Sequence, residues 1–536
     1  MASMEVSAYR YFVSTDGISY LDMSDAVFPG TEWRRLITGT WSPLYPFLLG
    51  LGRLLRPDPY REIVTGHLIN IPMFLAAFAA FEFFLRNVVP REEISDLTRE
   101  HVSLPRSVYL VVGYTLFLWA SIANITLRTL RADMLMTTFL LLAMGMLLRI
   151  KWRGGTWARY LTLGMILGFG YLAKAPILPI GGLILASSLL LAGDWKRTLP
   201  KALLSAIVSL AIGSLYFIPL SQKRGDLTLG ESSSYNYLIH VDRPETAWYL
   251  QQVGRGSGRF LHSATKIFDK PAVYQFSVEQ AVTYPMRFDP AYWAQGVKPR
   301  FYLRDQFRAL AGNLNQYKDI LERTGGLIAG LAVLWFVSGN GRQALVGIMT
   351  QWPLWFIGSS GLAMYALVHV EDRYVGVFFL LLWMGLLIGL RAPAKLLKEV
   401  APGIAWGIAT SILIPMIATV CSHFLVGFGA RDVDAEAARE LTRLGIHAGD
   451  NVARISAEVT DLAWARMLRV SIITEVDIEH ADNFWKSLPD QQEGALKAMA
   501  ATGARIVVAH ISEDLAPAGW QRLGKTLYWL RWLNTS

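Results

Sequence analysis

The sequence predicts a multi-pass α-helical membrane protein that ends in a small external α/β domain. Hydrophobic residues make up 53% of the 536-residue chain and charged residues only 17%, and the mean hydropathy is +0.33. Soluble domains usually carry about 25% charged residues, so this chain is too apolar to be soluble throughout. Its 18 tryptophans and 21 tyrosines are typical of a protein with two membrane–water interfaces. From about residue 429 the composition becomes that of a water-soluble domain.

Ten apolar stretches are candidates for membrane-spanning helices, since a span needs about 20 residues and fewer where neighbouring helices help. They lie at 62–85, 107–127, 132–149, 158–174, 176–193, 201–220, 326–341, 344–368, 374–391 and 402–427. The chain is thereby divided into an external loop with interfacial helices over 1–60, a transmembrane domain over 61–428 with an external insertion at 221–325, and the external α/β domain over 429–536. Residues 1–15 are too short to span a bilayer, and we expect a first spanning helix to be missing from the start of the chain.

The distribution of lysine and arginine predicts the orientation, because loops on the inner side of a membrane are enriched in these residues. Most of the basic loop residues fall on one side: Arg86, Arg91, Arg99, Arg106, Arg149, Lys151, Arg153, Arg159, Lys196, Arg197, Lys201, Arg342, Arg391, Lys395 and Lys398. The short loops of the other side hold only Arg128, Arg131, Lys174 and Arg373. The N-terminal loop, the 221–325 insertion and the C-terminal domain are therefore predicted to face outside. The net charge of +9 is explained by this asymmetry and does not indicate a nucleic-acid partner.

The α/β prediction for the C-terminal domain rests on alternating patterns. The segment DAEAARELTRLG has the spacing of an amphipathic helix, and NVARIS, RVSIIT and ARIVVAHI are typical of short strands. A helix over 489–502 separates two of the strands, which favours parallel pairing. No glycine-rich nucleotide-binding motif accompanies the pattern, so we expect an accessory domain. The single cysteine, Cys421, offers no disulfide or zinc-binding pattern.

A polar loop from Asp16 to Pro46 precedes the apolar stretches. It holds three acids (Asp16, Asp22 and Asp25), a pair of arginines and the turn sequence WSPLYP. A carboxylate at a membrane surface is suited to proton transfer in a reaction at that surface. However, Asp-Gly is a common turn, and aspartate is an ordinary N-cap at the start of a helix. Asp16 alone therefore fits a cap as well as a catalytic base.

Two further ionisable residues are predicted at the outer ends of spans, where charged groups are costly and usually functional. Asp133 begins the 132–149 stretch, where the helix dipole alone would favour an acid. Lys174 lies in GFGYLAKAP and is suited to holding a phosphate, although a lysine at this depth can also simply extend its amine to the interface.

The motif HVEDRY places His369, Glu371, Arg373 and Tyr374 at the outer end of a later span. Arginine suits bidentate contact with a phosphate, and the alternative for Arg373 is an ordinary ion pair with a neighbouring acid. His369 and Glu371 are candidate ligands for a divalent metal ion, the one cofactor that the sequence suggests.

These elements, in this order, resemble family 39 of the GT-C glycosyltransferases, which includes protein O-mannosyltransferases and lipid A aminoarabinose transferases. The resemblance covers roughly residues 10–428 and, on this chain, rests on Asp16-Gly17 with Tyr20, on Trp41-Ser42-Pro43 with Pro46, on Asp133, on Lys174 within its Leu-x-Lys element, and on the Glu-x-Arg-Tyr motif from Glu371 to Tyr374. Two positions depart from the family. Ala175 stands where a glycine is usual after the lysine, and Gly17 where a second acid often follows the first.

The resemblance implies a GT-C-like fold and the transfer of a hexosyl or pentosyl group from a polyprenyl-phosphate donor to an acceptor hydroxyl of a lipid, glycan or protein. The reaction would invert the sugar at the outer, periplasmic face of the bacterial inner membrane. It implies that Asp16 is the base with Asp133 in support, and that Lys174 and Arg373 hold the donor phosphate. Tyr20, Trp41 and Tyr374 would contact substrate.

Two other classes of protein also fit parts of the sequence. A lipid or sugar transporter would carry paired polar groups near the middle of the membrane and broken helices in related halves. A membrane-anchored binding protein would use only its external domains. Neither accounts for charged motifs that collect at one interface, and the sequence contains no internal repeat.

Overall fold

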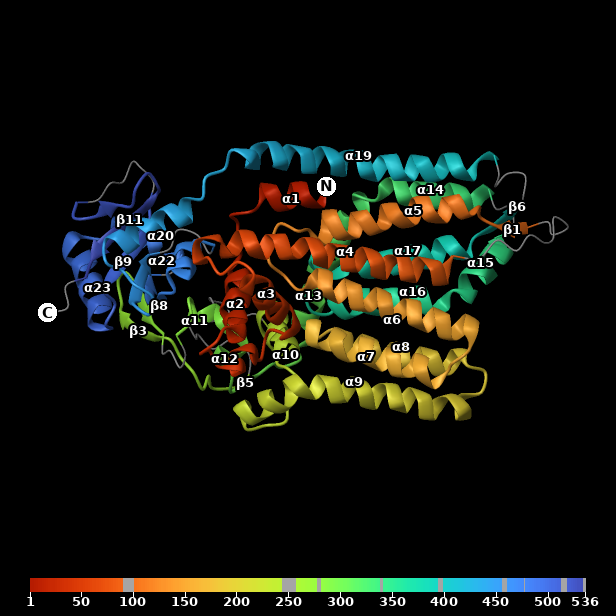
Figure 1. Cartoon of the computed structure of the whole chain (residues 1–536), viewed down its shortest axis with the longest axis horizontal. Coiled ribbons are helices and arrows are strands. Elements are labelled where there is room, and N and C mark those ends of the chain that lie inside the picture. Colours follow the sequence, from red (N-terminus) through yellow and green to blue (C-terminus); the bar gives the residue numbers. More distant parts are fainter. Residues whose placement is uncertain are drawn as a thin grey trace.

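The computed structural model shows a bundle of long helices with a mixed α/β region at one end (Figure 1). It describes residues 1–89, 101–242, 257–276, 281–337, 341–393, 399–455, 460–476, 478–511 and 518–533. Arg91, Arg99, Lys395 and Lys398, which contribute to the predicted orientation, lie outside the described residues.

Within the described residues, six helices are long and apolar enough to cross a membrane. These are α4 (Glu62–Val88), α5 (Arg106–Leu118) continued by the π-helix η4 (Trp119–Ile125), α6 (Asp133–Arg153), α9 (Trp195–Arg224), α17 (Asp372–Gly389) and α19 (Ala401–Phe428). Shorter helices complete the bundle: α7 (Trp157–Ala173), α8 (Ile177–Leu191), α14 (Gly325–Val337), α15 (Gly341–Thr350) and α16 (Trp352–Ala366). A multi-pass helical membrane protein, as predicted, is confirmed.

One predicted span is divided in the structure. The apolar stretch 344–368 forms α15 and α16, and Pro353 lies at the start of the second helix. Proline removes a backbone donor and disfavours a helical conformation in the residue before it, so a continuous helix is interrupted at this point. Hydropathy alone does not detect the break, because both halves are apolar.

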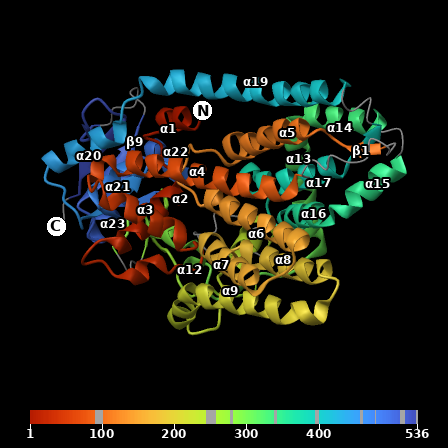
Figure 2. The same cartoon turned by 45° about the vertical axis from the view of Figure 1, so that its right-hand side comes forward.

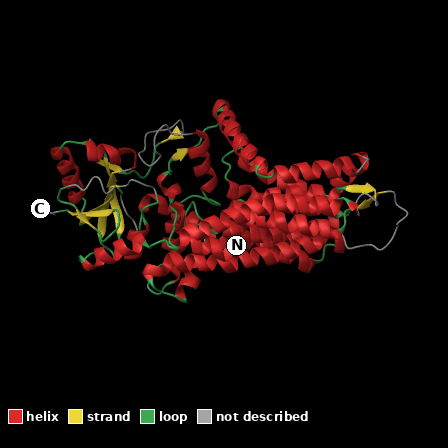
Figure 3. Ribbon diagram, turned by 90° about the horizontal axis from the view of Figure 1, so that it is seen from above, coloured by secondary structure: helices red, strands yellow, loops and turns green. Residues whose placement is uncertain are grey.

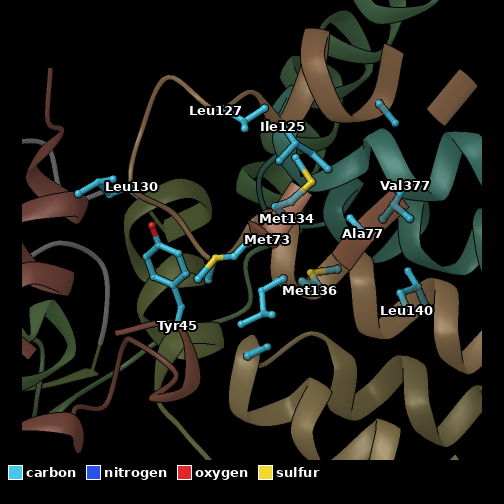
Figure 4. Packing of buried hydrophobic residues seen from close by; sticks show 14 of the residues in the cluster. Tyr45, Met73, Ala77, Ile125, Leu127, Leu130, Met134, Met136, Leu140 and Val377 are labelled. Atoms are coloured by element: carbon cyan, nitrogen blue, oxygen red, sulfur yellow. The ribbon is translucent and has the colours of Figure 1, made fainter. Parts of the chain in front are cut away.

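The centre of the bundle is formed by α6, whose apolar window is 83% buried. Met73 and Ala77 of α4 pack near Met134, Met136 and Leu140 of α6 (Figure 4). Lipid tails are as apolar as these side chains, so close van der Waals packing is the main stabilising term between spans. The packing fixes the ends of α6 relative to its neighbours. Farther out, α19 runs along the edge of the bundle beside α1 (Ala2–Ala8), α5 and α14 (Figure 2).

The N-terminal loop folds into short helices between the bundle and the α/β region (Figure 1). They are α2 (Thr15–Ser24), η1 (Asp25–Val27), η2 (Trp33–Leu36), α3 (Leu44–Leu54) and η3 (Pro59–Arg61). The insertion that follows α9 contributes α10 (Ser232–Tyr237), the π-helix η5 (Leu238–Asp242), β2 (Ser257–Gly258), β3 (Thr265–Phe268), β4 (Val273–Gln275), α11 (Pro285–Phe288), α12 (Pro290–Trp293), β5 (Val297–Lys298) and α13 (Leu303–Glu322).

The C-terminal region confirms the predicted small α/β domain. Its elements are α20 (Val433–Arg443), β7 (Asn451–Ile455), α21 (Ala463–Leu468), β8 (Ser471–Val476), α22 (Ile478–Lys486), α23 (Pro489–Ala501), β9 (Ile506–His510), β10 (Gln521–Arg522) and β11 (Tyr528–Trp532). The parallel strands β8, β7 and β9 are the three that the sequence predicts. Figure 3 shows this sheet at the C-terminal end of the molecule, and the small pair of β1 (His101–Ser103) and β6 (Arg391–Pro393) at the opposite end.

The sheet also contains strands from outside the C-terminal region. Its order is β10-β11-β9-β7-β8-β4-β3, and β4 pairs antiparallel with β8. β3 and β4 come from the insertion, more than 170 residues before β7 in the sequence. The α/β region is therefore built from two parts of the chain, and it holds the insertion directly against the C-terminal strands.

Candidate functional site

Four helix ends meet at the end of the bundle that faces the α/β region. Asp16 lies in the first turn of α2, Asp133 begins α6, Lys174 ends α7, and Arg373 lies in the first turn of α17. The four residues come from segments up to 357 positions apart, and ion pairs connect them into one cluster. The structure thus brings together the four charged residues for which the sequence predicts catalytic or phosphate-binding roles.

Arg373 is the hub of this cluster. Its Nη1 lies 3.4 Å from Oδ2 of Asp133, and its Nη2 lies 3.8 Å from Oδ2 of Asp16. Its Nε donates to Glu371, and Nη2 donates to the Tyr374 hydroxyl at 2.8 Å. The planar guanidinium has donors enough for all of these partners, whereas a lysine has no comparable fork. Arg373 therefore links both aspartates and is itself held from its own helix.

Asp133 and Lys174 form the second part of the cluster. Asp133 is only 3% exposed, and its Oδ1 accepts from Nζ of Lys174. Lys174 follows α7 in an extended conformation, so the chain turns before the next helix and directs the amine into the cluster. A buried carboxylate needs such partners, because an unpaired charge away from water is strongly unfavourable. Asp133 is thus neutralised by Lys174 on one oxygen and by Arg373 on the other.

Asp16 is not the N-cap of its helix. Ser14 is the cap residue, and its side chain accepts from the backbone N–H of Gly17. The Asp16 side chain is 21% exposed, and its cationic neighbours lie beyond hydrogen-bond distance, at 3.7 Å from Arg131 and 3.8 Å from Arg373. The cap interpretation of Asp16 is therefore wrong: the hydroxyl of Ser14 already fills that role, and the carboxylate faces the cluster.

Arg131 is a member of the site that the sequence does not indicate as functional. Its Nε is buried and has no hydrogen-bond partner among the described residues, although it lies 3.7 Å from Oδ2 of Asp16. In the sequence it stands two positions before Asp133 and contributes only to the orientation argument. The short spacing in RTLRAD could have indicated a shared location, but nothing in it distinguishes Arg131 from Arg128, which instead pairs with Glu5.

Aromatic rings surround the cations. Nζ of Lys174 lies 4.2 Å and the Arg373 guanidinium 4.4 Å from the centroid of the Tyr374 ring. The same ring stacks on Tyr365, with the two centroids 5.1 Å apart. Cations over aromatic faces are attracted by the ring quadrupole, so Tyr374 helps to hold both cations. Its predicted contact with substrate stays a prediction.

Tyr20 follows Asp16 by four residues in α2, and its ring lies beside that of Trp41. Tyr20 is buried at 5% exposure, with its ring centroid 5.3 Å from Trp41 and 5.0 Å from Tyr45. Burial, with smaller contributions from Asp16 and Asp133, raises the pKa of Tyr20 well above its ordinary value, so the phenol stays protonated. Trp41 is half-buried, and its indole N–H has no partner among the described residues. Their predicted contact with substrate stays a prediction as well.

The candidate metal ligands form a pair that already has a cationic partner. Nε2 of His369 lies 3.3 Å from Oε1 of Glu371, while Oε2 of Glu371 accepts from Arg373. Burial alone would raise the pKa of Glu371, but the hydrogen bonds from His369 and Arg373 outweigh it and hold the pKa below its ordinary value. His369 also stacks on His240 with ring centroids 3.7 Å apart. Among the described residues no group of three or more histidines, cysteines and acids is placed to hold a metal ion.

Comparison with known proteins identifies similar solved structures. The chain is similar to ArnT from Cupriavidus metallidurans bound to undecaprenyl phosphate, with 12% identity, a TM-score of 0.48 and coverage of 98% of this chain and 95% of the other. The apo form of that protein gives 13% identity, a TM-score of 0.45 and the same coverage.

An oligosaccharyltransferase from Archaeoglobus fulgidus, in complex with Zn and sulfate, gives 10% identity and a TM-score of 0.42 over 95% of this chain and 67% of the other. No protein-family model matches the chain, and no curated protein is similar to it.

Proposed function

We propose that the protein is a membrane glycosyltransferase that moves a sugar from a polyprenyl-phosphate donor to an acceptor hydroxyl. The observation that carries the proposal is the ion-paired cluster in which the half-buried carboxylate of Asp16 faces Arg373 and Arg131, with Lys174 and Asp133 adjoining. A reaction of this type needs a base for the acceptor and fixed cations for the leaving phosphate, and the cluster offers both within one site. The sequence resemblance to GT-C family 39 supports the same class of donor.

The chemistry follows from which partners each group has. The acceptor oxygen attacks the anomeric carbon of the sugar, and the bond from that carbon to the phosphate oxygen breaks. The proton of the acceptor hydroxyl passes to Asp16, whose cationic neighbours lie beyond hydrogen-bond distance. Negative charge that develops on the departing polyprenyl phosphate is stabilised by Lys174 and Arg373, which are fixed before the reaction by Asp133, Glu371 and Tyr374. A direct attack of this kind inverts the configuration at the sugar.

We place the site at the outer face of the bacterial inner membrane, with the C-terminal domain outside. The placement rests on the lysine and arginine asymmetry of the loops. Both aspartates, Lys174 and Arg373 lie at helix ends on one side of the bundle, which is where a soluble acceptor and a lipid-anchored donor can meet. The donor's sugar, hexosyl or pentosyl, is the subject of the assay below.

A binding experiment tests the phosphate site without knowledge of the sugar or the acceptor. The purified protein in nanodiscs is titrated with undecaprenyl phosphate and, separately, with the uncharged alcohol undecaprenol. We expect tight binding of the phosphate only, and a loss of at least about tenfold in Lys174→Met and Arg373→Met, since each removes a charge-assisted hydrogen bond of about 1.5–3 kcal/mol. Equal binding of the alcohol, or unchanged binding in both variants, would contradict the phosphate site.

A turnover assay tests the transfer. A panel of hexosyl and pentosyl polyprenyl-phosphate donors is supplied with cell-envelope acceptors, and radiolabelled sugar is followed from lipid to acceptor. Sugar transfer by the wild type distinguishes an enzyme from a transporter, which would move the lipid across a proteoliposome membrane with its sugar still attached. Movement of intact lipid without transfer would contradict the proposal.

A further inference from the structure

An arginine of the C-terminal domain enters the N-terminal loop. Arg466, in α21, is 1% exposed and has three carboxylates around its guanidinium. Its Nη1 lies 2.5 Å from Oδ1 of Asp22, its Nη2 lies 2.7 Å from Oδ1 of Asp25, and its Nε lies 2.9 Å from Oε1 of Glu62. Each partner belongs to a different element: α2, η1 and the start of α4. One side chain thus joins the α/β region to two elements of the N-terminal loop and to the first long helix of the bundle.

Other arginines share the carboxylates around Arg466. Arg53 of α3 lies 3.0 Å from Asp25 and 2.8 Å from Glu62, and Arg469 lies 2.8 Å from Glu62. Asp22 and Glu62 are 2% and 1% exposed, so neither carboxylate can rely on water. Charges this deeply buried are tolerated only when they are paired, and removal of one partner commonly destabilises by about 3–5 kcal/mol. Asp25 and Glu62 keep other arginine partners without Arg466, whereas Arg466 is the one cation paired with Asp22 among the described residues, so the place of Asp22 depends on Arg466.

A second segment of the α/β region holds the same helix. The backbone N–H of Thr283 donates to Oδ2 of Asp22 at 3.1 Å, and its hydroxyl donates to Oδ1 at 2.8 Å. Ser19 of α2 donates its hydroxyl to the carbonyl of Arg287 at 2.6 Å. The segment that holds these residues is itself fixed to the sheet, because the Tyr284 hydroxyl donates to Glu475 of β8 at 2.7 Å. Helix α2 is thus anchored to the sheet through two routes.

Helix α2 is also the helix that carries Asp16. Asp16 precedes Asp22 by six residues, which is about 9 Å along an α-helix at 1.5 Å per residue. A helix of this length moves as a unit, so a shift at Asp22 is transmitted to Asp16. Lys174 and Arg373 come from α7 and α17, which contribute no carboxylate to the Arg466 network. The distance between base and phosphate cations is therefore set partly from outside the membrane domain.

We propose that Arg466 is a positioning residue for the transfer reaction. Through it the α/β region holds the base Asp16 at the distance from Lys174 and Arg373 that the reaction needs. The inference rests on the proposed function. It gives the C-terminal domain a role that its own strands and helices do not suggest. Arg466 touches neither donor nor acceptor in this scheme and acts through Asp22 and α2.

The test separates positioning from a purely structural contribution. Arg466→Met keeps most of the side-chain length and removes the charge, Arg466→Lys keeps the charge, and Arg531→Met is the matched control. Arg531, in β11, pairs with Glu493 at 2.6 Å, and β11 is separated from β8 by β9 and β7. For each variant, kcat per folded molecule, the donor KM and the Kd for undecaprenyl phosphate are measured.

We expect Arg466→Met to lower kcat at least about tenfold per folded molecule, while donor KM and Kd stay within about twofold. This split follows because the shortest contacts of the phosphate cations are with Asp133, Glu371 and Tyr374, none of which belongs to α2. Arg466→Lys should recover part of kcat, and Arg531→Met should match the wild type. An unchanged kcat per folded molecule, or an equal loss of donor binding, would overturn the positioning role.

If Arg466→Met does not fold, Asp22→Asn provides a second test. Asp22→Asn keeps the size of the side chain, removes the charge that pairs with Arg466, and leaves one of the two oxygens that accept from Thr283, so it weakens both links of Asp22 to the α/β region. The same split in kcat is expected, and its absence would overturn the proposal. If the wild type itself transfers no sugar, the proposed function fails and not the link between the domains. If the wild type transfers sugar and these variants do so at the same rate, the proposed function stands and the positioning role of Arg466 fails.

Discussion

Replacement of Asp16 by asparagine is the most direct test of the catalytic assignment. The change preserves the size of the side chain, removes its charge and leaves the cap of α2 intact, because Ser14 provides the cap. The carboxylate is 21% exposed, and its two cationic neighbours lie 3.7 Å and 3.8 Å away. Ion pairs that are long and partly exposed contribute about 0–1 kcal/mol each. The free energy of unfolding of the variant should therefore lie within about 1–2 kcal/mol of the wild-type value.

The effect on transfer should be much larger than the effect on folding. Loss of a general base usually lowers the rate by about 100- to 10,000-fold, which corresponds to about 2.7–5.4 kcal/mol at 1.36 kcal/mol per tenfold change. Binding of undecaprenyl phosphate should persist, because Lys174 and Arg373 remain. The measurements are transfer of labelled sugar by purified protein, lipid binding and thermal unfolding on the same preparation.

Asp372→Asn is the matched control for this variant. Asp372 lies beside Arg373 in sequence but pairs with Arg323 at 2.6 Å, away from the cluster. It should transfer sugar within a few-fold of the wild type. Turnover of the Asp16 variant at a similar level would refute the reasoning, because it would mean that a well-placed carboxylate is not needed to take the acceptor proton.

Three further outcomes are expected. Arg373→Lys should weaken binding of undecaprenyl phosphate about tenfold without loss of expression, since lysine keeps the charge but not the fork; binding at the wild-type level would argue against a bidentate contact. In a Cys421→Ala background, Lys497→Cys should react with an impermeant thiol reagent from outside the cell, and Ala158→Cys should not; both positions are exposed. The reverse result would mean that the orientation is inverted. Glu371→Gln should lower thermal stability at neutral pH. Because the folded-state pKa of Glu371 is depressed, the difference from the wild type should persist above the ordinary carboxyl pKa of about 4.3 and shrink as the pH falls through the lower folded-state value; a difference that does not change with pH would contradict the sign.

Much of the fold is predictable because its signals are local. Apolar stretches of sufficient length mark the long helices, and strand-length apolar runs mark β7, β8 and β9. Asp133, Lys174 and Arg373 are also predictable, because each stands at the end of an apolar stretch. Asp16 lies in a polar loop and is predicted through the family resemblance. The division of 344–368 into two helices depends on one proline within a uniformly apolar run, and hydropathy does not resolve it.

The long-range contacts are not predictable in this way. Arg466 bonds to residues 404 and 444 positions away in the sequence, and nothing in AWARML distinguishes it from a solvent-exposed arginine. The pairing of β4 with β8 is equally unpredictable, because a strand of three residues is too short to show a periodic pattern. The place of Arg131 in the site is unpredictable for a different reason. A basic residue next to the end of a span is already explained by membrane orientation.

In the proposed reaction, Asp16 is better suited to be the base than Asp133 or Asp22. A base needs a lone pair free to accept the acceptor's proton, and a carboxylate with a cation on each oxygen presents no free oxygen to an incoming hydroxyl. Asp133 is in that state, with Lys174 on one oxygen and Arg373 on the other. Asp22 is held by Arg466 and Thr283 and is shielded from the site by burial. Asp16 has its cations at longer range and through Oδ2 alone, so its other oxygen can face an incoming hydroxyl. The same cations that stabilise the departing phosphate therefore leave one carboxylate of the cluster able to take the proton.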